Sequence, residues 1–362
     1  MEYSIKNFSV NKKNEDFSDY ILGADVGGTN TNIGIAGIKK SKPILLFSIN
    51  FKTKNLESII PAINTTLQYT NNNYNIKIKN ACIGAAGIIS SKNEYAELTN
   101  IKWDINLKEI KNQTTLKKIY LINDFEAVGY GINFLDQNNK KNIIKIKNGK
   151  NYENTIKPTK AILGAGTGLG KSIIIYNKNI DLYIPIKSEG GHEDLPIYNK
   201  KELDLIEFIK KQNQIIKPIN YEEVLSGRGI ENIYSYLRSK EKIKETKYTK
   251  IIDKSDNKPA LISKYKELDK TCKETIKIYT KFYARCAKNF VLDTLAEGGL
   301  YIYGGIAVKN KEIFTSKDFI SEFKKSHRRE DILKKIPINI IMNYDAGLYG
   351  ACYAAIHHFD NK

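Results

Sequence analysis

The chain has 362 residues, which is enough for two domains that each bury a core of their own. Its net charge of +18 is high, but the lysines are dispersed along the chain, so we expect no specific nucleic-acid partner. The four cysteines lie far apart without a C-x-x-C pair, and no stretch has the length and apolarity of a membrane span. These features argue against zinc ribbons, redox motifs and a membrane partner, and they predict a cytoplasmic protein.

Residues 1–19 are polar and contain no apolar segment, which predicts a flexible N-terminal extension. The first clear element is the apolar run 20–26, followed by the stretch Asp25-Val26-Gly27-Gly28-Thr29-Asn30 and an alternating apolar pattern from Ile33. This order predicts a strand, a tight glycine turn and a second strand. Glycines let backbone N–H groups approach an anion, Thr29 and Asn30 add donors, and Asp25 suits a hydrated Mg²⁺ carried by a phosphate. A plain hairpin turn is the alternative.

The next elements predict an α/β domain with a mixed sheet: a helix in 56–69, a strand in 80–89, a helix in 104–111 and a strand in 118–122. The last strand ends on Asn123 and Asp124, where α/β proteins usually carry ligand-binding side chains. An amide beside a carboxylate can hold neighbouring hydroxyls, and the carboxylate can accept a proton from one of them. The alternative is structural, with Asn123 as a helix N-cap and Glu126 completing a capping box.

Residues 138–160 are rich in Lys and Asn, which predicts a loop between domains. The glycine-rich stretch 164–170 follows an apolar run and precedes Lys171 and Ser172. It does not fit the G-x-G-x-x-G dinucleotide fingerprint, and it fits a Walker A loop only loosely. Walker A also requires a helix next, whereas the β-branched residues of 173–175 favour a strand. We therefore prefer a second strand–glycine turn–strand unit, and two such units suggest an internal duplication with a nucleotide between them.

The second half carries two further candidate sites. Glu189 and His192, separated by two glycines, could bind sugar hydroxyls, with a solvated acidic loop as the alternative. Gly304 and Gly305 end an apolar run and suit the close approach of an adenine or ribose, with an ordinary strand-to-helix turn as the alternative. The remaining patterns predict a helix in 203–211, a capped helix start in 220–229 that ends at glycine, a long helix in 271–295, a strand in 338–342 and a terminal helix from Asp345.

Six motifs in this order resemble the bacterial-type glucokinase family of the actin-like (hexokinase) sugar kinase superfamily. They are the stretches 25–30, 123–127, 164–170, 188–192, 224–227 and 304–307. The related repressor, open-reading-frame and kinase family usually carries a cysteine-rich zinc motif after its His, and no such motif follows His192. The resemblance implies an α/β fold of two actin-like (ribonuclease H-like) domains with mixed sheets and a cleft between them. We expect a small domain of residues 20–134 plus 343–362 and a large domain of 135–342.

The resemblance implies ATP-dependent phosphorylation of glucose to glucose 6-phosphate, with Asp124 as the general base. It also implies that Asn123, Glu189, His192 and Glu222 bind glucose. Glu222 is preferred to Glu223 because it stands two residues before Val224. The residues implied for ATP with its Mg²⁺ are Asp25, Gly27, Gly28, Thr29, Asn30, Gly166, Thr167, Gly168, Gly304 and Gly305. No residue is assigned as a metal ligand, and we expect a homodimer.

Three other functions compete with this interpretation. A P-loop NTPase would use Lys171 and Ser172, and a non-catalytic sugar-sensing protein could have the same fold. A kinase for another hexose, such as mannose or an N-acetyl hexosamine, would use the same chemistry, because function depends on the site rather than on the fold. A basic cluster of Lys324, Lys325 and 327–329 has no counterpart in these motifs, and we interpret it as a solvated face.

Overall fold

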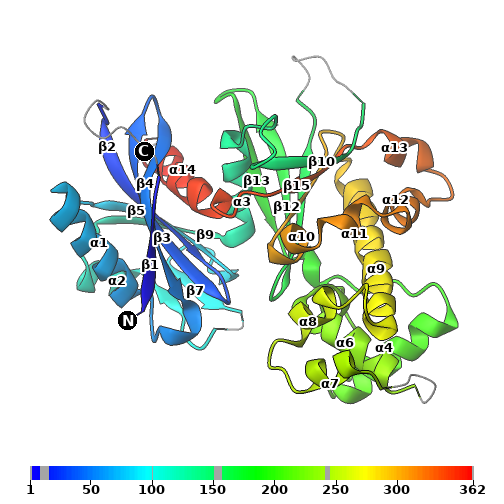
Figure 1. The fold of residues 1–362 in the computed structure, drawn as a ribbon. Helices are drawn as coiled ribbons and strands as arrows, with labels where there is room; N and C mark the ends of the chain where they lie inside the picture. Colours follow the sequence, from blue (N-terminus) through cyan, green and yellow to red (C-terminus); the bar gives the residue numbers. More distant parts are fainter. Residues whose placement is uncertain (1, 9–15, 100, 151–156, 241–244, 361–362) are drawn as a thin grey trace. The chain divides into compact units, whose positions relative to one another are not determined.

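The computed structural model describes residues 2–8, 16–99, 101–150, 157–240 and 245–360. The chain divides into two units, and both combine helices with mixed β-sheets (Figure 1). The first unit contains Met1–Asp136, Tyr176–Lys187 and Asn343–Lys362, and the second contains Gln137–Ile175 and Ser188–Met342. The sequence predicts Tyr176–Lys187 in the second domain, but Leu182 and Ile184 of this segment pack into a core of the first unit.

The first unit is built on a six-stranded sheet with the strand order β1-β4-β3-β2-β5-β9. Strands β1 to β4 are antiparallel neighbours, and β5 and β9 continue the sheet parallel to β2. A separate small sheet has the order β6-β7-β8. The strands are β1 (Tyr3–Asn7), β2 (Asp19–Val26), β3 (Asn30–Lys39), β4 (Lys42–Lys52), β5 (Asn80–Ala85), β6 (Gly87–Ile89), β7 (Tyr95–Leu98), β8 (Ile105–Asn106) and β9 (Lys118–Asn123).

Different helices cover the two faces of this sheet (Figure 1). Successive residues of a strand point to opposite faces, so the neighbours Ile21 and Leu22 belong to different cores. The core with Leu22 includes residues of α1 and α2, and the core with Ile21 includes residues of α3 and α14. The helices are η1 (Thr53–Asn55), α1 (Ile60–Tyr74), α2 (Leu107–Gln113), α3 (Asp124–Gly131), η2 (Ile132–Phe134) and α14 (Ala346–Asp360), where η denotes a 3₁₀ helix.

The N-terminal residues form an edge strand rather than a flexible extension. Strand β1 pairs with β4, placing Tyr3 opposite Phe51 and Asn7 opposite Phe47. The predicted flexible extension is therefore wrong for residues 3–7, while residues 9–15 lie outside the described chain. All the side chains of β1 are exposed. Backbone hydrogen bonds thus hold the strand. Because its side chains are exposed, the sequence carries no buried apolar pattern that would predict it.

A second six-stranded sheet has the order β10-β15-β14-β11-β12-β13, and all of it except the end of β12 and most of β13 belongs to the second unit. Strands β11, β14 and β15 are parallel, and β12 returns antiparallel to β11. Strand β10 pairs with β15, so the predicted inter-domain loop contains a sheet strand. The strands are β10 (Ile143–Lys147), β11 (Lys160–Ala165), β12 (Leu169–Asn177), β13 (Leu182–Ser188), β14 (Leu300–Tyr303) and β15 (Ile338–Ile341).

Helix α9 (Lys270–Thr294) is the central helix of the second unit and confirms the long helix predicted there. It contacts β11 and the helices α5, α6, α8, α11, α12 and α13. The helix predicted to start in 220–229 ends at Leu225, just before Gly227, and Gly227 then begins a second helix, α6. The other helices are η3 (Gly190–His192), α4 (Lys200–Gln212), α5 (Glu222–Leu225), α6 (Gly227–Arg238), α7 (Lys247–Asp253), α8 (Lys258–Lys264), α10 (Gly305–Lys309), α11 (Lys311–Thr315), α12 (Lys317–Lys324) and α13 (Glu330–Lys335). None of the helices in the described chain combines the length and apolarity that crossing a bilayer requires.

Candidate functional site

The first glycine turn joins β2 to β3 in the first unit. The Gly27 N–H donates to the Asn30 carbonyl at 3.0 Å, and the Thr53 hydroxyl donates to the Gly27 carbonyl at 2.7 Å. The Thr53 N–H donates to the Thr29 carbonyl at 3.1 Å. The predicted hairpin is therefore confirmed, and η1 ties both sides of its turn in place. Gly28 and the exposed Thr29 stand at the tip.

Asp25, at the end of β2, lies near two other carboxylates, Asp124 and Asp345. Burial and, to a lesser degree, these two neighbours raise the pKa of Asp25 to about 7. Gly347 allows the first turn of α14 to approach, because a Cβ there would lie 2.7 Å from Asp25 Oδ2. The ammonium of Lys6 on β1 forms an ion pair with Asp345. The ionised form of Asp25 is thus disfavoured in this structure, and a cation beside it would favour that form.

Asn123 is the N-cap of α3, directly before Asp124. Asn123 Oδ1 accepts the Phe125 N–H at 2.9 Å, and Glu126 Oε2 accepts the Asn123 N–H at 3.4 Å, which confirms the structural alternative of a cap. The Asn123 amide NH₂ donates to the Gly87 carbonyl at 3.4 Å. Asp124 is the first residue of α3, and its Oδ1 also accepts the Phe125 N–H, at 2.9 Å. The cap therefore fixes Asp124 at a helix N-terminus, where the helix dipole favours an ionised carboxylate.

The second glycine turn joins β11 to β12 in the second unit. The Gly166 N–H donates to the Gly168 carbonyl at 2.8 Å, and the Gly227 N–H donates to the Gly166 carbonyl at 2.9 Å. A Cβ on Gly166 would meet no atom within 4 Å, whereas one on Gly168 would lie 2.7 Å from Glu222 Oε2. Thr167 between them is exposed. The turn is thus open at Gly166 and packed against a buried carboxylate at Gly168.

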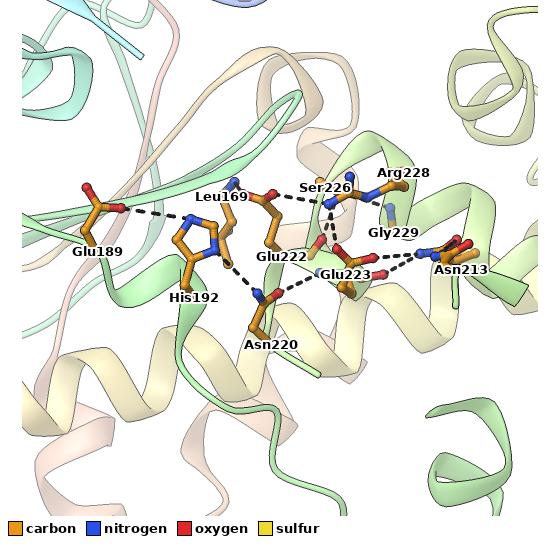
Figure 2. A network of polar contacts seen from close by, with 11 residues as sticks. Leu169, Glu189, His192, Asn213, Asn220, Glu222, Glu223, Ser226, Arg228 and Gly229 are labelled. Carbon is orange, nitrogen blue, oxygen red and sulfur yellow. Dashed lines mark hydrogen bonds and ion pairs between the residues drawn. The ribbon is translucent and has the colours of Figure 1, made fainter. Parts of the chain in front are cut away.

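Glu222 supports this turn from α5, as Figure 2 shows. Its side chain is 8% exposed, and Oε2 accepts the Leu169 N–H at 3.0 Å. Oε1 accepts a hydrogen bond from Arg228 Nη2 at 3.3 Å, and the same Nη2 donates to Glu223 Oε1 at 2.6 Å. The Ser226 hydroxyl donates to the Glu222 carbonyl at 2.8 Å. Glu222 therefore has a structural role that the sequence does not predict.

Glu189 and His192 lie together at η3 (Figure 2). His192 Nε2 is 3.9 Å from Glu189 Oε2, and the Asn220 amide lies 3.4 Å from His192 Nδ1. The side chains of Glu189 and His192 are 68% and 47% exposed. A Cβ on Gly191 would lie 1.9 Å from the Leu169 carbonyl, so the glycine permits η3 to pack against the start of β12. A carboxylate and an imidazole are thus presented to solvent on a closely packed support.

Gly304 and Gly305 follow β14, the strand beside β11. Tyr303 lies opposite Gly164 in this parallel pair. Gly304 has a φ of +106°, and a Cβ there would lie 2.7 Å from the Ala165 carbonyl. A Cβ on Gly305 would meet no atom within 4 Å. The second unit therefore brings the predicted residues 304–305 beside the glycine turn 166–168, as expected where neighbouring parallel strands end.

Lys171, the residue that a P-loop would need, lies on β12 and is fully buried. Its ammonium donates to Glu193 Oε2 at 2.7 Å and lies 5.4 Å and 5.0 Å from the ring centroids of Tyr221 and Phe290. The following Ser172 is fully buried as well. Because a strand follows the glycine turn and the lysine points into the core, the P-loop interpretation is wrong.

Three residues of these sites were missed by the sequence analysis: Lys6, Asn220 and Arg228. Asn220 and Arg228 flank Glu222 in the chain and could have been considered with it, whereas Lys6 reaches Asp345 only through the pairing of β1 with β4. Within the described residues, no group of three or more His, Cys, Asp or Glu side chains has the arrangement of a metal site.

Comparisons with known proteins extend over most of the chain. A family model described as glucokinase matches residues 22–358. A glucokinase of Nostoc sp. (strain PCC 7120) is 30% identical over 349 residues, which cover 92% of this chain and 98% of the relative. The crystal structure of the Balamuthia mandrillaris glucokinase in complex with glucose has a TM-score of 0.76 at 21% identity and covers 93% of both chains.

A ROK family glucokinase from Streptomyces griseus, solved with glucose and AMPPNP, has a TM-score of 0.64 at 17% identity. It covers 93% of this chain and 99% of that chain. At such identities these structures show a common fold, and they confirm the predicted α/β fold of the actin-like sugar kinases. The family model and the Nostoc relative, taken together over this length, show that the chain belongs to the glucokinase family.

Proposed function

We propose that this protein transfers a phosphoryl group from ATP to the 6-hydroxyl of glucose, with Asp124 as the general base. The observation that carries the assignment of the base is the position of Asp124, the first residue of α3, directly after β9. The N-terminus of a helix favours the ionised carboxylate, which is the form that accepts a proton. Phosphoryl transfer depends mainly on positioning and charge stabilisation, so a fixed base on the attacking hydroxyl suits this chemistry.

Asn123, Glu189, His192 and Glu222 are proposed to bind the other hydroxyls of the sugar. The exposure of Glu189 and His192 supports this role, because a carboxylate and an imidazole open to solvent can accept and donate hydrogen bonds. Asn123 and Glu222 already accept backbone N–H groups. Their oxygens carry further lone pairs, so a sugar hydroxyl could be added without breaking these contacts.

The two glycine turns and residues 304–305 are proposed to hold ATP. The open space at Gly166 and Gly305 supports this role, because a phosphate or a ribose can approach the backbone there closely. Asp25 is the residue whose charge would face the Mg²⁺ that accompanies ATP, since a nearby cation would offset the burial and the two carboxylates that disfavour its ionised form. Mg²⁺ would neutralise charge on the phosphates. Asp25, 27–30, 166–168, Gly304 and Gly305 are thus the proposed nucleotide residues.

The proposed function is tested with Asp124→Ala and Asp124→Asn in a coupled assay of ADP release with MgATP and glucose. Loss of a general base should lower kcat by about 10²- to 10⁴-fold. The thermal shift produced by glucose should remain, because the residues proposed to hold the sugar are unchanged. Glu109→Gln is the control, since Glu109 also lies in the first turn of a helix, α2, but has no proposed role.

Near-normal turnover of both Asp124 variants would refute the assignment of the base. Assays with mannose, fructose and N-acetylglucosamine in place of glucose test the preference for glucose among hexoses. The predicted homodimer is tested separately by light scattering of the purified protein, where a monomeric mass would contradict it.

A further inference from the structure

A basic depression on the second unit is unrelated to the residues assigned to the reaction. It has a volume of about 510 Å³ and is lined by residues of α11, α12, α13 and the segment after α12. This volume lies within the range of about 300–1,000 Å³ that is usual for small-molecule sites. Its lining includes Lys324 and Lys325, two members of the basic cluster that the sequence predicts to be a solvated face.

The charge of the lining is strongly positive. Lys317, Lys324 and Lys325 contribute three ammonium groups, and within the part of the chain that the structure describes none of them forms an ion pair. Glu330 contributes a carboxylate, but this carboxylate already pairs with Lys334 at 2.8 Å. The charge of Lys324 also interacts with Glu330, so an anion placed in the depression would meet three ammonium groups and one carboxylate.

The surrounding backbone is held in place by two further lysines. The Lys147 ammonium donates to the carbonyls of Lys334 at 2.6 Å and Ile336 at 2.7 Å, at the end of α13. The buried Lys288 donates to the Lys325 carbonyl at 3.1 Å, at the end of α12. These contacts fix the two segments that carry the exposed cations, so the cations are displayed on a supported surface.

Two of these lysines also repel each other. Burial and, to a lesser degree, the charge of Lys324 lower the pKa of Lys147 to about 8. An anion bound to Lys324 would reduce this repulsion, so binding would be favoured by more than the contacts that it makes directly.

The rest of the lining suggests what else such a ligand carries. Thr315 and Ser321 present hydroxyl groups, Ile320 adds an apolar side chain, and Glu330 provides a carboxylate. Hydroxyls and a carboxylate bind sugar or polyol hydroxyls, and the volume of the depression suits a small molecule. We infer that this depression is a binding site for a small phosphorylated sugar or polyol, with the phosphate held by Lys324 and Lys325 and the hydroxyls by Ser321 and Glu330.

Isothermal titration with ribose 5-phosphate, in the presence of saturating glucose, tests this site. The wild-type protein should bind the probe, while ribose should bind undetectably and inorganic phosphate more weakly. Lys324→Ala/Lys325→Ala should weaken binding about tenfold or more, because two charge-assisted hydrogen bonds are removed. Lys108→Ala/Lys111→Ala on α2 of the first unit is the control with the same change of charge, and it should bind like the wild type.

Ser321→Ala supplies a second test that leaves the charge unchanged. It should weaken binding of ribose 5-phosphate but not of inorganic phosphate, because it removes only a partner of the hydroxyl groups. Equal binding by all the variants, or no binding of ribose 5-phosphate by the wild type, would overturn the proposal. So would preferential binding of a short DNA duplex that is lost in Lys324→Ala/Lys325→Ala, since the cluster would then be a nucleic-acid surface.

Discussion

The Glu222 carboxylate accepts a hydrogen bond from the Leu169 N–H at 3.0 Å, and this contact joins α5 to the end of the second glycine turn. Glu222 is one of the residues proposed to bind glucose, and the turn is proposed to bind ATP. The buried Glu222 carboxylate therefore supports the turn proposed to bind ATP and is itself proposed to bind glucose. Substitutions at Glu222 should affect protein stability, glucose binding and ATP binding together.

Glu222→Ala should destabilise the protein by about 1–3 kcal/mol, because it leaves the Leu169 N–H without its acceptor. Glu222→Gln keeps an acceptor for this N–H and should be less destabilising, yet it removes the charge that pairs with Arg228. Chemical denaturation and the KM values for glucose and ATP measure these effects. Glu223→Gln is the matched control, and a rise in the glucose KM in that variant alone would show that Glu223 is the sugar ligand.

Gly191→Ala should lower the stability of the protein, whereas Gly166→Ala should mainly weaken ATP binding. A Cβ at Gly191 would lie 1.9 Å from the Leu169 carbonyl, so the alanine should destabilise the protein by about 1–3 kcal/mol through overpacking. A Cβ at Gly166 would meet no atom within 4 Å, so the stability of the Gly166→Ala protein should change by less than about 1 kcal/mol. Its methyl group would nevertheless stand where a phosphate is proposed to approach. Thermal melting and the KM for ATP separate the two cases, and an unchanged ATP KM in Gly166→Ala would contradict the proposed nucleotide role.

Lys171→Met should lower stability without greatly changing nucleotide binding. Lys171 is fully buried, but Glu193, its partner, is 46% exposed and can turn toward water once the ammonium is gone. The loss of stability should therefore be about 1–3 kcal/mol, which is below the cost of leaving a buried charge without its partner. The KM for ATP should change by no more than about threefold, which corresponds to well under 1 kcal/mol of binding free energy. A loss of ATP turnover in a folded Lys171→Met protein would restore the P-loop interpretation.

Asp25→Asn should stabilise the protein, and the gain should grow with pH. The pKa of Asp25 is raised to about 7 in the folded protein, so between pH 4 and 7 the folded state binds a proton that the unfolded state has lost. Wild-type stability therefore falls as the pH rises through this range, while the amide is insensitive to it. At pH 8 the two proteins should differ in unfolding free energy by about 2 kcal/mol. This is less than the full pKa shift would give, because Asp25 is half-buried and solvent screens its charge.

Denaturation curves of both proteins at pH 4, 6 and 8 check the effect of Asp25→Asn. A stability difference that stays constant with pH would mean that the carboxylate is ionised throughout this range. The same substitution at Asp19, which is exposed at the start of β2, is the control and should show little change with pH.

The strand–glycine turn–strand units and the long helix α9 could be predicted because their signals are local. An apolar run predicts β2, an alternating apolar pattern predicts β3, and the helical spacing in 271–295 predicts α9 to within one residue at each end. The sequence also left both interpretations of Asn123 open, and the structure confirms the cap while the sugar-binding role stays a prediction. Both functions fit one amide, because the cap uses only part of its hydrogen-bonding capacity.

The features that the sequence could not predict depend on partners far away in the chain. Strand β1 is defined by its pairing with β4, and its exposed side chains carry no burial pattern. Lys171 resembles a phosphate-binding lysine until its partner Glu193 is placed beside it. Likewise, Glu222 stands 53 residues from Leu169, and nothing in either local sequence suggests that they meet.

The position of α14 in the first unit bears on how the protein is made. This helix lies after the whole second unit in the chain, yet it packs against α3, β2 and β5 and supplies much of one core of the first unit. On the ribosome, the second unit is therefore synthesised completely before that core can close. Until then the face of the sheet that carries Ile21 and Ile122 has α3 but lacks α14, so a nascent chain would depend on rapid completion or on a chaperone to avoid aggregation.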